Sequence, residues 1–580
     1  MSTSTCKMLV TASRLLLLTI CLIKPAVSLP QTGTHYNVLF IVMDDMNERA
    51  GVFGYPEVLT PNLNRLAQRG VVFKKAYCQF PLCNASRTSL LSGWRPDKTG
   101  VFDNNTSPRS KMGQNVKFLP EYFGLYGYHT ERVGKIMHGG YQNEIDWDYS
   151  DRTRVDDLSS GAEDGSWWVT SLQDDKTVNG KYAGAMVQRM KQTPPQPFFL
   201  ALGLTVHNPF TPSLKYWNMY GVPSVQQLLP VNESGDKGTL KGNGSGNIDL
   251  PDTPPNDRND APNMAFPSKV NKTTAEWQNT QHAYFAEVTE MDAQLGTVLD
   301  EMDRQNLWQN TVVIFLSDHG QHLGEHEGLW GKNTLFEESG LSPLIVYVPG
   351  KTPGTCNALA ELVDIYPSLA EICSLPAPSG MEGTSFARLL NNVNTPWKEA
   401  VFTQVERKKT KGRSAITNQY RYNSWGPFGE ELYDLTTDSF EYTNLSGKSA
   451  YTSELKMMRD ILADGWTKAL PPSDLNANKT VAVNNEAINA AKNNTAADII
   501  IYPNPSPGGN ISVQFKSNNT ANAEIIIYDN AGRIVFKMIN KVYKGNNVLP
   551  LQLKNITAGI YNLELNDNGI KQQAKLILEK

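Results

Sequence analysis

The chain lacks the features that mark several protein classes. It has only 6 cysteines in 580 residues, which is too sparse for a disulfide framework. No stretch after the N-terminal region is apolar for long enough to cross about 30 Å of hydrocarbon, so no transmembrane segment is expected. Its 40% hydrophobic and 19% charged residues are ordinary for a globular chain, and they exclude wholesale disorder and a collagen-like fibre.

Excess positive charge is also absent. Lysine and arginine total 54 against 58 acidic residues, a net charge of −4, so we expect no nucleic-acid partner. The first thirty residues carry about +3 and those after residue 500 about +4, which leaves about −11 for the segment between them. An anionic substrate would therefore need a focused cationic pocket, because the global field would repel it.

Residues 1–28 have the pattern of a cleaved secretory signal. Lys7 and Arg14 precede an apolar run over 15–23, and small residues follow at the peptidase site. A membrane anchor is the alternative, but the run is too short and Lys24 interrupts its far end. We therefore expect a protein that leaves the cytoplasm.

Cysteine positions leave two questions open. Cys21 could indicate a lipoprotein, although the bulky Ile20 before it disfavours that reading. Among the four cysteines that follow the signal, Cys356 and Cys373 close a short loop and could pair, but the sequence does not determine pairing geometry.

Residues 29–384 alternate between strand and helix patterns. Continuous apolar runs over 37–43, 198–204 and 312–316 indicate strands buried on both faces of a parallel sheet. Helical patterns cover 62–70 and 280–302. The sequence therefore predicts an α/β sandwich. It also contains a surface insertion at 222–272, rich in Pro, Gly, Asn and Asp, of a kind that often shapes an enzyme cleft.

Three further segments follow. Residues 385–470 contain short strand patterns and end in a helix near 453–470, which predicts a smaller α+β subdomain. Residues 471–499 have the composition of a linker. Residues 500–580 predict a small β-sandwich, with strands at 511–515, 523–528, 534–539, 547–553, 561–565 and 573–578.

The C-terminal segment resembles the sorting domain read by the type IX secretion system of Bacteroidota. The resemblance rests on YPNP at 502–505, IYDNAGR at 527–533, AGIY at 558–561 and a terminal lysine. It implies the type IX machinery as a partner and a secreted or cell-surface location reached through the periplasm. A carbohydrate-binding sandwich is the alternative, but the cluster of exposed tryptophans such modules commonly use is missing.

Polar residues follow the three buried strands. Asp44 and Asp45 end the first, His207 follows the second, and Asp318 with His319 ends the third. Ligands of parallel sheets bind beyond the carboxyl ends of the strands, so we expect these groups to converge. Three carboxylates and an imidazole suit a hard cation, Ca²⁺ or Mg²⁺, better than zinc.

A second cluster carries a family resemblance. Cys83-x-Ala85-x-Arg87, followed by LLSG at 90–93, is similar to the signature of type I sulfatases, in which the cysteine is converted to formylglycine. The segments TPNLNRLA (60–67), WRPD (94–97), GKIMH (134–138), HNPF (207–210), SDHG (317–320), GEH (324–326) and Lys332 match the same family in the same order. The resemblance spans about residues 35–465.

Within that family the chain is most similar to iduronate-2-sulfatases, partly because His319 stands where many sulfatases have Asn. Ser439 departs from the pattern, because the family's C-terminal turn usually has Pro there. The resemblance implies an alkaline-phosphatase-like sandwich with a large mixed, mostly parallel sheet. It further implies that Cys83 is a substrate of the formylglycine-generating enzyme.

Roles for single residues follow from the same resemblance. One Ca²⁺ per chain would be bound by Asp44, Asp45, Cys83, Asp318 and His319, the last of which could instead only orient the site. Arg87 would stabilise the hydrated formylglycine at the start of a helix expected near Ser86. Lys135 and Lys332 would clamp the sulfate, and His207 and His138 would be acid and base, in roles that could be exchanged.

Three other polar residues near these segments stay outside the catalytic set. His322 and His326 could contact substrate or face solvent. Cys78 is expected to be a buried free thiol, because pairing with Cys83 would block the modification.

The sequence therefore predicts a secreted sulfatase acting on a sulfated polysaccharide or its oligosaccharides. Ulvan is favoured as the substrate, and a glycosaminoglycan such as heparan sulfate is the other candidate. Two alternatives remain: a phosphate or phosphonate ester hydrolase of the same fold, and a catalytically silent glycan-binding protein.

Overall fold

The structure is a computed structural model. It describes residues 36–151, 166–192, 197–220, 248–267 without 249 and 252, 271–471, and 499–579 apart from short gaps. The chain divides into two compact units, Met1–Leu475 and Asn476–Lys580. The predicted signal at 1–28, most of the linker at 471–499 and the first half of the 222–272 insertion lie outside the described residues.

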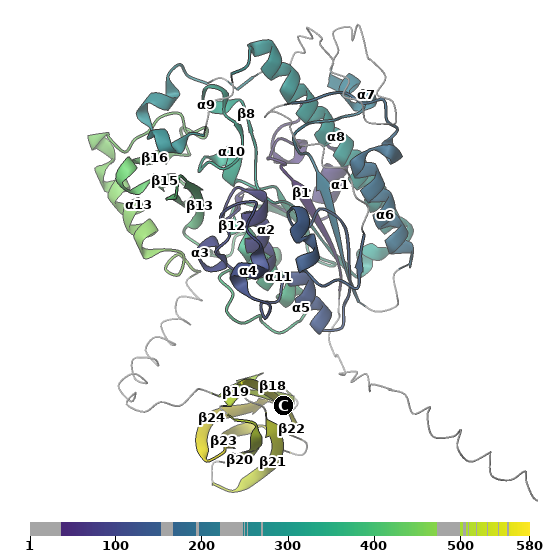
Figure 1. The fold of residues 1–580 in the computed structure, drawn as a ribbon, viewed down its shortest axis with the longest axis vertical. Helices are drawn as coiled ribbons and strands as arrows, with labels where there is room; N and C mark the ends of the chain where they lie inside the picture. The colour runs from purple at the N-terminus through teal and green to yellow at the C-terminus, as the bar shows by residue number, and fades with distance from the viewer. Residues whose placement is uncertain are drawn as a thin grey trace, which may run out of the picture. The chain divides into compact units, whose positions relative to one another are not determined.

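An eight-stranded mixed sheet forms the centre of the first unit (Figure 1). Its strand order is β11-β2-β10-β7-β1-β6-β4-β5, and only β10 runs antiparallel to its neighbours. The bounds are β1 Asn37–Asp44, β2 Val71–Phe73, β4 His129–Gly134, β5 Tyr149–Ser150, β6 Phe198–Thr205, β7 Thr311–Ser317, β10 Leu344–Tyr347 and β11 Gly354–Cys356. The three predicted strands are the adjacent central ones, β7, β1 and β6.

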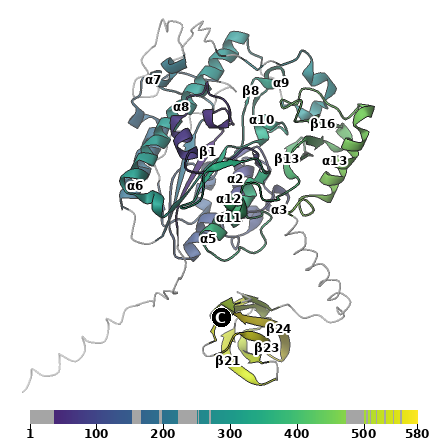
Figure 2. The same cartoon turned by 180° about the vertical axis from the view of Figure 1, so that it is seen from behind.

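Both faces of this sheet are covered by helices, as the two opposite views show (Figures 1 and 2). Val38, Phe40 and Val42 of β1 point into a core shared with one set of helices, α2 (Cys83–Ser92), α5 (Leu119–Leu125) and α11 (Ile365–Ile372). Leu39 and Ile41 point to the opposite core, with α1 (Pro61–Ala67), α6 (Val178–Gln192) and α8 (Thr274–Arg304). Burial on both faces explains why the central strands are apolar without alternation.

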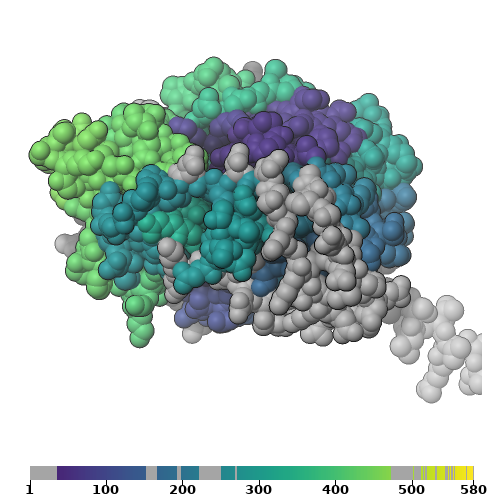
Figure 3. Space-filling view, turned by 90° about the horizontal axis from the view of Figure 1, so that it is seen from above, coloured from purple at the N-terminus to yellow at the C-terminus, as the bar shows by residue number. Residues whose placement is uncertain are grey.

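A smaller antiparallel sheet completes the first unit. Its strands, in order, are β13 (Val401–Arg407), β14 (Thr410–Ile416), β15 (Tyr420–Ser424) and β16 (Glu430–Asp434). Helix α13 (Thr452–Asp464) packs Leu455 and Met458 on this sheet. Figure 3 shows these green residues forming one flank of the unit, beside the teal residues from the middle of the chain.

The second unit is a β-sandwich of two sheets. One contains β17 (Ile500–Tyr502), β19 (Asn510–Ser517) and β22 (Gly545–Gln552); the other contains β18 (Ser506–Pro507), β24 (Ile570–Glu579), β23 (Gly559–Asp567), β20 (Ala521–Tyr528) and β21 (Ile534–Val542). A core that includes Ile525, Leu563 and Leu576 lies between the sheets. The six predicted strands are all present, as β19 to β24, and only β22 ends earlier than predicted, at Gln552.

Among the helices of the described residues, none has the length and apolarity needed to cross a membrane. The cysteines Cys78, Cys83, Cys356 and Cys373 are all buried and free. The possible Cys356–Cys373 pairing is therefore not formed, and the prediction of a buried free thiol at Cys78 is confirmed.

Candidate active site

The predicted site residues converge at the carboxyl ends of three adjacent strands. Because β1 pairs with β7 on one side and β6 on the other, their ends deliver Asp44 and Asp45, Asp318 and His319, and His207 to one edge of the sheet. Asp45 adopts a φ of 63°, a left-handed conformation that turns the chain sharply after the strand. Its backbone N–H donates to Asp318 Oδ1 at 3.3 Å, which ties the ends of β1 and β7 together.

Arg87 is the cationic centre beneath this edge. It is fully buried on α2, and its guanidinium pairs with Asp44 at 3.0 Å and with Asp318 at 2.7 Å. It also donates to the carbonyl oxygens of Lys135 at 2.6 Å and of Ile136 at 3.0 Å. Its rigid fork therefore fixes the two strand ends and the segment after β4 in one arrangement.

Two lysines bring the positive charge that the sequence predicted for an anion pocket. Lys135 Nζ lies 2.5 Å from Asp44 Oδ2, and Lys332 Nζ pairs with both carboxylate oxygens of Asp45. Burial alone would raise the pKa of Asp44, but Lys135 and Arg87 outweigh it and hold the pKa well below its ordinary value. Burial also raises the pKa of Asp45, but Lys332 and His207 outweigh it, and the pKa falls to about 2. Both carboxylates are therefore ionised at neutral pH.

Cys83 is the first residue of α2, with Leu82 as its N-cap, so the helix begins three residues before the predicted Ser86. The backbone N–H of Ser86 accordingly bonds Leu82 O inside the helix. Cys83 Sγ lies 3.6 Å from Asp45 Oδ1 and 3.4 Å from His319 Nε2. Burial raises the pKa of this thiol above its ordinary value, so an unmodified Cys83 would be protonated and a poor nucleophile.

The donor groups fit a hard divalent cation. Within the described part of the chain, donor atoms of Asp45, Cys83 and His319 lie within 4.8 Å of one another, as do those of Asp44, Cys83 and Asp318. The set contains three buried carboxylates, which is the chemistry that Ca²⁺ or Mg²⁺ prefers. His319 Nδ1 lies 2.9 Å from Gly320 O, which orients its other nitrogen toward Cys83 and Asp45.

The two candidate acid and base histidines differ in setting. His207 Nε2 lies 3.6 Å from Asp45 Oδ2, its Nδ1 lies 2.5 Å from Asn208 O, and its side chain is 32% exposed. His138 is half-buried and its Nδ1 has no hydrogen-bond partner among the described residues. Burial and then the charge of Lys135 lower the pKa of His138 to about 4, and burial also lowers that of His207. At neutral pH both are neutral in this state.

Both readings of His322 and His326, as substrate contacts or as solvent-facing residues, conflict with their burial. They are 0% and 1% exposed. His322 Nε2 lies 2.7 Å from Thr334 Oγ1, and His326 Nδ1 lies 2.9 Å from Asp257 Oδ2. They support the polypeptide around the site, and their omission from the catalytic set agrees with this.

No sequence pattern indicated that the small antiparallel sheet, β13 to β16, supports the site. Arg407, at the end of β13, donates to Asn333 O, the residue after Lys332, and to Met264 O. Arg421 of β15 is buried and donates to Leu335 O, while its guanidinium pairs with Glu441 at 2.5 Å. These contacts join residues 74 and 86 positions apart, which no local pattern reveals.

We expect Arg407→Met to misplace Lys332. Because a displacement of about 1 Å at a reacting centre can cost on the order of 100-fold, kcat/KM on an aryl sulfate should fall by about 10- to 100-fold. The matched control is Arg459→Met, which removes an exposed arginine that pairs with Glu430 in the same subdomain. Equal kcat/KM for the two variants would show that Arg407 does not position the site.

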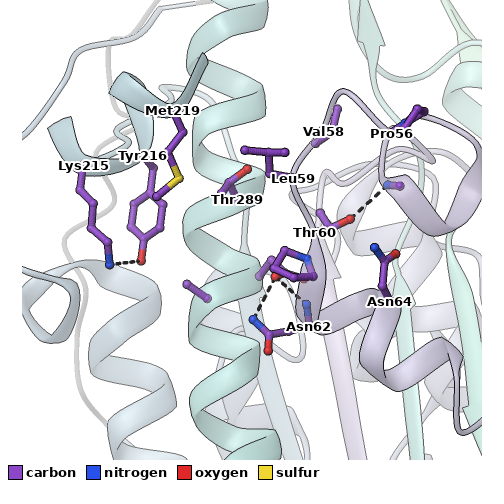
Figure 4. A pocket seen from close by; sticks show the side chains of 14 residues that line it. Pro56, Val58, Leu59, Thr60, Asn62, Asn64, Lys215, Tyr216, Met219 and Thr289 are labelled. Atoms are coloured by element: carbon purple, nitrogen blue, oxygen red, sulfur yellow. Dashed lines mark hydrogen bonds between the residues drawn. The ribbon is translucent and has the colours of Figure 1, made fainter. Parts of the chain in front are cut away.

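A cavity lies away from the predicted site residues. It has a volume of about 610 Å³ and lies among α1, α7 (Leu214–Trp217) and α8. Figure 4 shows Lys215, Tyr216 and Met219 on one side of Thr289, with Leu59 and Asn62 on the other. None of the predicted site residues lines it, so cavity size does not locate the catalytic centre.

Comparison with known families identifies three segments. Residues 36–374 match the sulfatase family, residues 324–467 match the C-terminal region of N-sulphoglucosamine sulphohydrolase, and residues 500–579 match a secretion system C-terminal sorting domain. The first match covers more than half of the chain. These matches confirm both resemblances predicted from the motifs.

Individual relatives agree with this. A sulfatase of Formosa agariphila is 28% identical over 453 residues, covering 73% of this chain and 86% of its own length. Mouse iduronate 2-sulfatase is 30% identical over 409 residues, covering 59% and 69%.

Solved structures show the same fold. A 2-O GAG sulfatase aligns with a TM-score of 0.60 and 22% identity, covering 75% of this chain and 92% of its own. The phosphonate monoester hydrolase of Agrobacterium radiobacter aligns with a TM-score of 0.61 and 18% identity, covering 74% and 95%. The predicted alkaline-phosphatase-like architecture is thereby confirmed. On the family match and the relatives, the chain belongs to the sulfatase family and is a sulfuric ester hydrolase.

Proposed function

We propose that this protein is an exported, formylglycine-dependent sulfatase that cleaves sulfate monoesters on a sulfated glycan. The observation that carries the proposal is the position of Cys83. It begins α2, it contacts Asp45 and His319, and two lysines reach the same carboxylate cluster. A site of this kind places a modifiable nucleophile beside cationic side chains that can bind a tetrahedral anion.

A calcium ion would be held by Asp44, Asp45, Asp318, His319 and the modified Cys83. When bound, the ion supplies positive charge that offsets the negative charge on the sulfate oxygens and on the attacking oxygen. Arg87 holds Asp44 and Asp318 in place for it. Lys135 and Lys332 are close enough to this cluster to bind sulfate oxygens once the ion shares the carboxylates.

Formylglycine at Cys83 would provide, as its hydrate, two hydroxyl groups on one carbon. One hydroxyl loses its proton as its oxygen attacks sulfur and displaces the alcohol. Deprotonation of the other hydroxyl then releases sulfate as the aldehyde re-forms, and water adds to the aldehyde to restore the hydrate. His207 would take up a proton, which Asp45 at 3.6 Å from its Nε2 favours, and would then give it to the departing sugar oxygen. His138 would remove the proton in the second step, as its low pKa keeps it neutral and able to accept one.

The substrate class rests on the relatives and on the tail. Similarity to iduronate 2-sulfatases and to a 2-O GAG sulfatase supports a sulfated sugar near a uronic acid. The sorting-domain match supports export by the type IX system to the cell surface or the medium. Ulvan is our first candidate substrate and heparan sulfate the second. We also propose that the chain consists of a catalytic subdomain over 29–384, a smaller C-terminal subdomain over 385–470, a linker over 471–499 and a sorting domain over 500–580.

The test compares rates on an aryl sulfate and the matching aryl phosphate. We expect faster turnover of the sulfate. Faster phosphate turnover would favour the alternative of a phosphate or phosphonate ester hydrolase. A phosphonate monoester hydrolase has the same fold. Binding of glycan without release of sulfate from any ester would favour the silent glycan-binding alternative.

Metal removal should lower both activity and stability. In the described part of the chain, the lysine and arginine side chains that pair with these three buried carboxylates are Arg87, Lys135 and Lys332. Calcium at about 100 times its dissociation constant should therefore stabilise the folded protein by about 2.7 kcal/mol, measured by thermal unfolding with and without a chelator. Asp45→Asn should abolish this calcium-dependent shift, whereas Asp300→Asn, at an exposed acid on α8, should leave it intact. A shift that survives in Asp45→Asn would place the ion elsewhere.

A further inference from the structure

One face of helix α8 contacts three separate segments that carry candidate site residues. The contacts come from a series that we call the α8 stripe: Trp277, Gln281, Tyr284 and Glu287. Successive members are three or four residues apart, so each lies on the same face of the helix as the next. All four are buried, and three of them are polar. Polar side chains are rarely buried unless they are hydrogen-bonded, so their partners show what the stripe holds.

The first two residues of the α8 stripe hold the hairpin that precedes Lys332. Gln281 Nε2 donates to Leu323 O at 2.6 Å, and the ring of Trp277 lies 5.2 Å from that of Trp330. Leu323 and Trp330 are paired across this hairpin. Because Trp330 is two residues before Lys332, these contacts fix the backbone from which the lysine extends.

Tyr284 holds the sharp turn that follows β1. Its hydroxyl accepts from Asn47 N at 2.9 Å, and it lies 3.3 Å from Asp45 O and 3.1 Å from Asn47 Oδ1, to either of which it can donate. The left-handed backbone of Asp45 is costly for a residue other than glycine and persists only where its surroundings fix it. Tyr284 therefore helps to fix the carboxylate that pairs with Lys332.

Glu287 holds the segment that follows His207. Its Oε2 accepts from Thr211 N at 2.8 Å, four residues after the histidine. Glu290, three residues further along α8, accepts from Ser213 N, also at 2.8 Å. The two carboxyl groups therefore anchor the backbone just beyond His207 to the helix.

One aromatic ring links the three segments. Phe210 is fully buried three residues after His207. Its ring packs edge-on against Tyr284 and against Trp330, with centroids 5.3 Å and 5.8 Å apart. Protein interiors are close-packed, so a shift of any one segment would displace this ring and disturb the other two.

We propose that α8 positions the catalytic groups, with Tyr284 as the positioning residue for the calcium ligand Asp45 and Glu287 as the positioning residue for the acid His207. This inference rests on the proposed function and makes it more specific, because it assigns the support of two catalytic groups to one helix. Neither Tyr284 nor Glu287 touches the reacting atoms. Each acts through the backbone segment that it holds.

The first test is Tyr284→Phe, which keeps the ring against Phe210 and removes the hydroxyl. Calcium alone is titrated calorimetrically into chelator-treated protein. We expect the Kd for calcium to rise about 10- to 100-fold, the usual cost of losing a residue that orients a metal ligand. The matched control is Tyr366→Phe, at an equally buried tyrosine whose hydroxyl donates to Lys117 O at 3.1 Å, and its Kd should equal that of the parent protein. A lower unfolding temperature for Tyr284→Phe with an unchanged Kd would refute the positioning role.

The second test is Glu287→Met, which removes the acceptor for Thr211 N. A sugar alcohol needs a proton to leave, whereas 4-nitrophenolate leaves without one, so a misplaced acid should affect only the sugar ester. We expect kcat on a sulfated disaccharide to fall about 10- to 100-fold and kcat on 4-nitrophenyl sulfate to change by less than about 3-fold. Glu287→Gln should recover most of the loss, because its amide oxygen also accepts. Burial raises the pKa of Glu287 well above its ordinary value, so the native side chain is likewise uncharged at neutral pH.

Two results would overturn the role of Glu287. Equal losses on both esters would show a general structural defect, and no loss on either would show that Thr211 N does not position the acid. Failure of the proposed function looks different. A parent protein that binds no calcium, or that hydrolyses neither ester, would refute the proposed function and this inference with it. Calcium binding and turnover by the parent, with unchanged values in both variants, would refute the role of α8 alone.

Discussion

Replacing Cys83 by alanine should abolish the release of inorganic sulfate while the protein remains folded. The side chain is small and buried at the first position of α2, where alanine is well tolerated, so stability should change little. Losing the nucleophile should lower kcat on an aryl sulfate by at least about 10⁴-fold, as for other enzymes whose nucleophile is removed. The measurement is steady-state sulfate release together with thermal unfolding.

Cys83→Ser is the informative companion variant. A serine hydroxyl can attack sulfur once, but it lacks the second hydroxyl that would release the product. We therefore expect at most a single turnover, seen as a mass increase of the protein by one SO₃ group. Multiple turnovers by either variant would contradict the assignment of residue 83 as the nucleophile.

Removing Arg87 should give the largest loss of stability among the site variants. In Arg87→Met, Asp44 and Asp318 lose a fully buried partner, and the carbonyl oxygens of Lys135 and Ile136 lose their donors. Breaking a buried pair in this way typically costs about 3–5 kcal/mol. Denaturant unfolding of the calcium-free protein should show that loss, and activity should fall with it.

Arg65→Met is the matched control for Arg87. Arg65 also bridges two aspartates, Asp300 and Asp303, but at the surface of the molecule. Exposed pairs of this kind contribute about 0–1 kcal/mol, so this variant should be nearly as stable as the parent protein. If both variants lost the same stability, the buried network under the site would not be the element that holds the strand ends together.

Much of the site could be predicted because its residues lie in short local patterns. Asp44, His207 and Asp318 each follow an apolar strand, and the order β7-β1-β6 then brings them together. Cys83 and Arg87 lie within a single turn and a half of helix α2. For residues that follow strands, a parallel sheet places their side chains at the same edge once the strands are neighbours.

Other features depend on contacts that no local pattern contains. The burial of His322 and His326 results from packing against Thr334 and Asp257. Helix α2 starts at Cys83 because Ser86 N–H donates to Leu82 O. The sequence did not predict this start, since Leu82 is not a residue type that typically caps a helix. The support of Lys332 by Arg407, through Asn333 O, joins segments that are far apart in sequence.

The most direct test of the mechanism uses active enzyme secreted by its native route. It measures the mass of the peptide that contains residue 83 and the amount of divalent metal bound to the same protein. The account predicts an aldehyde in place of the thiol and about one calcium ion per chain. Full sulfatase activity from protein with an intact Cys83 thiol, or with no bound divalent ion, would contradict it.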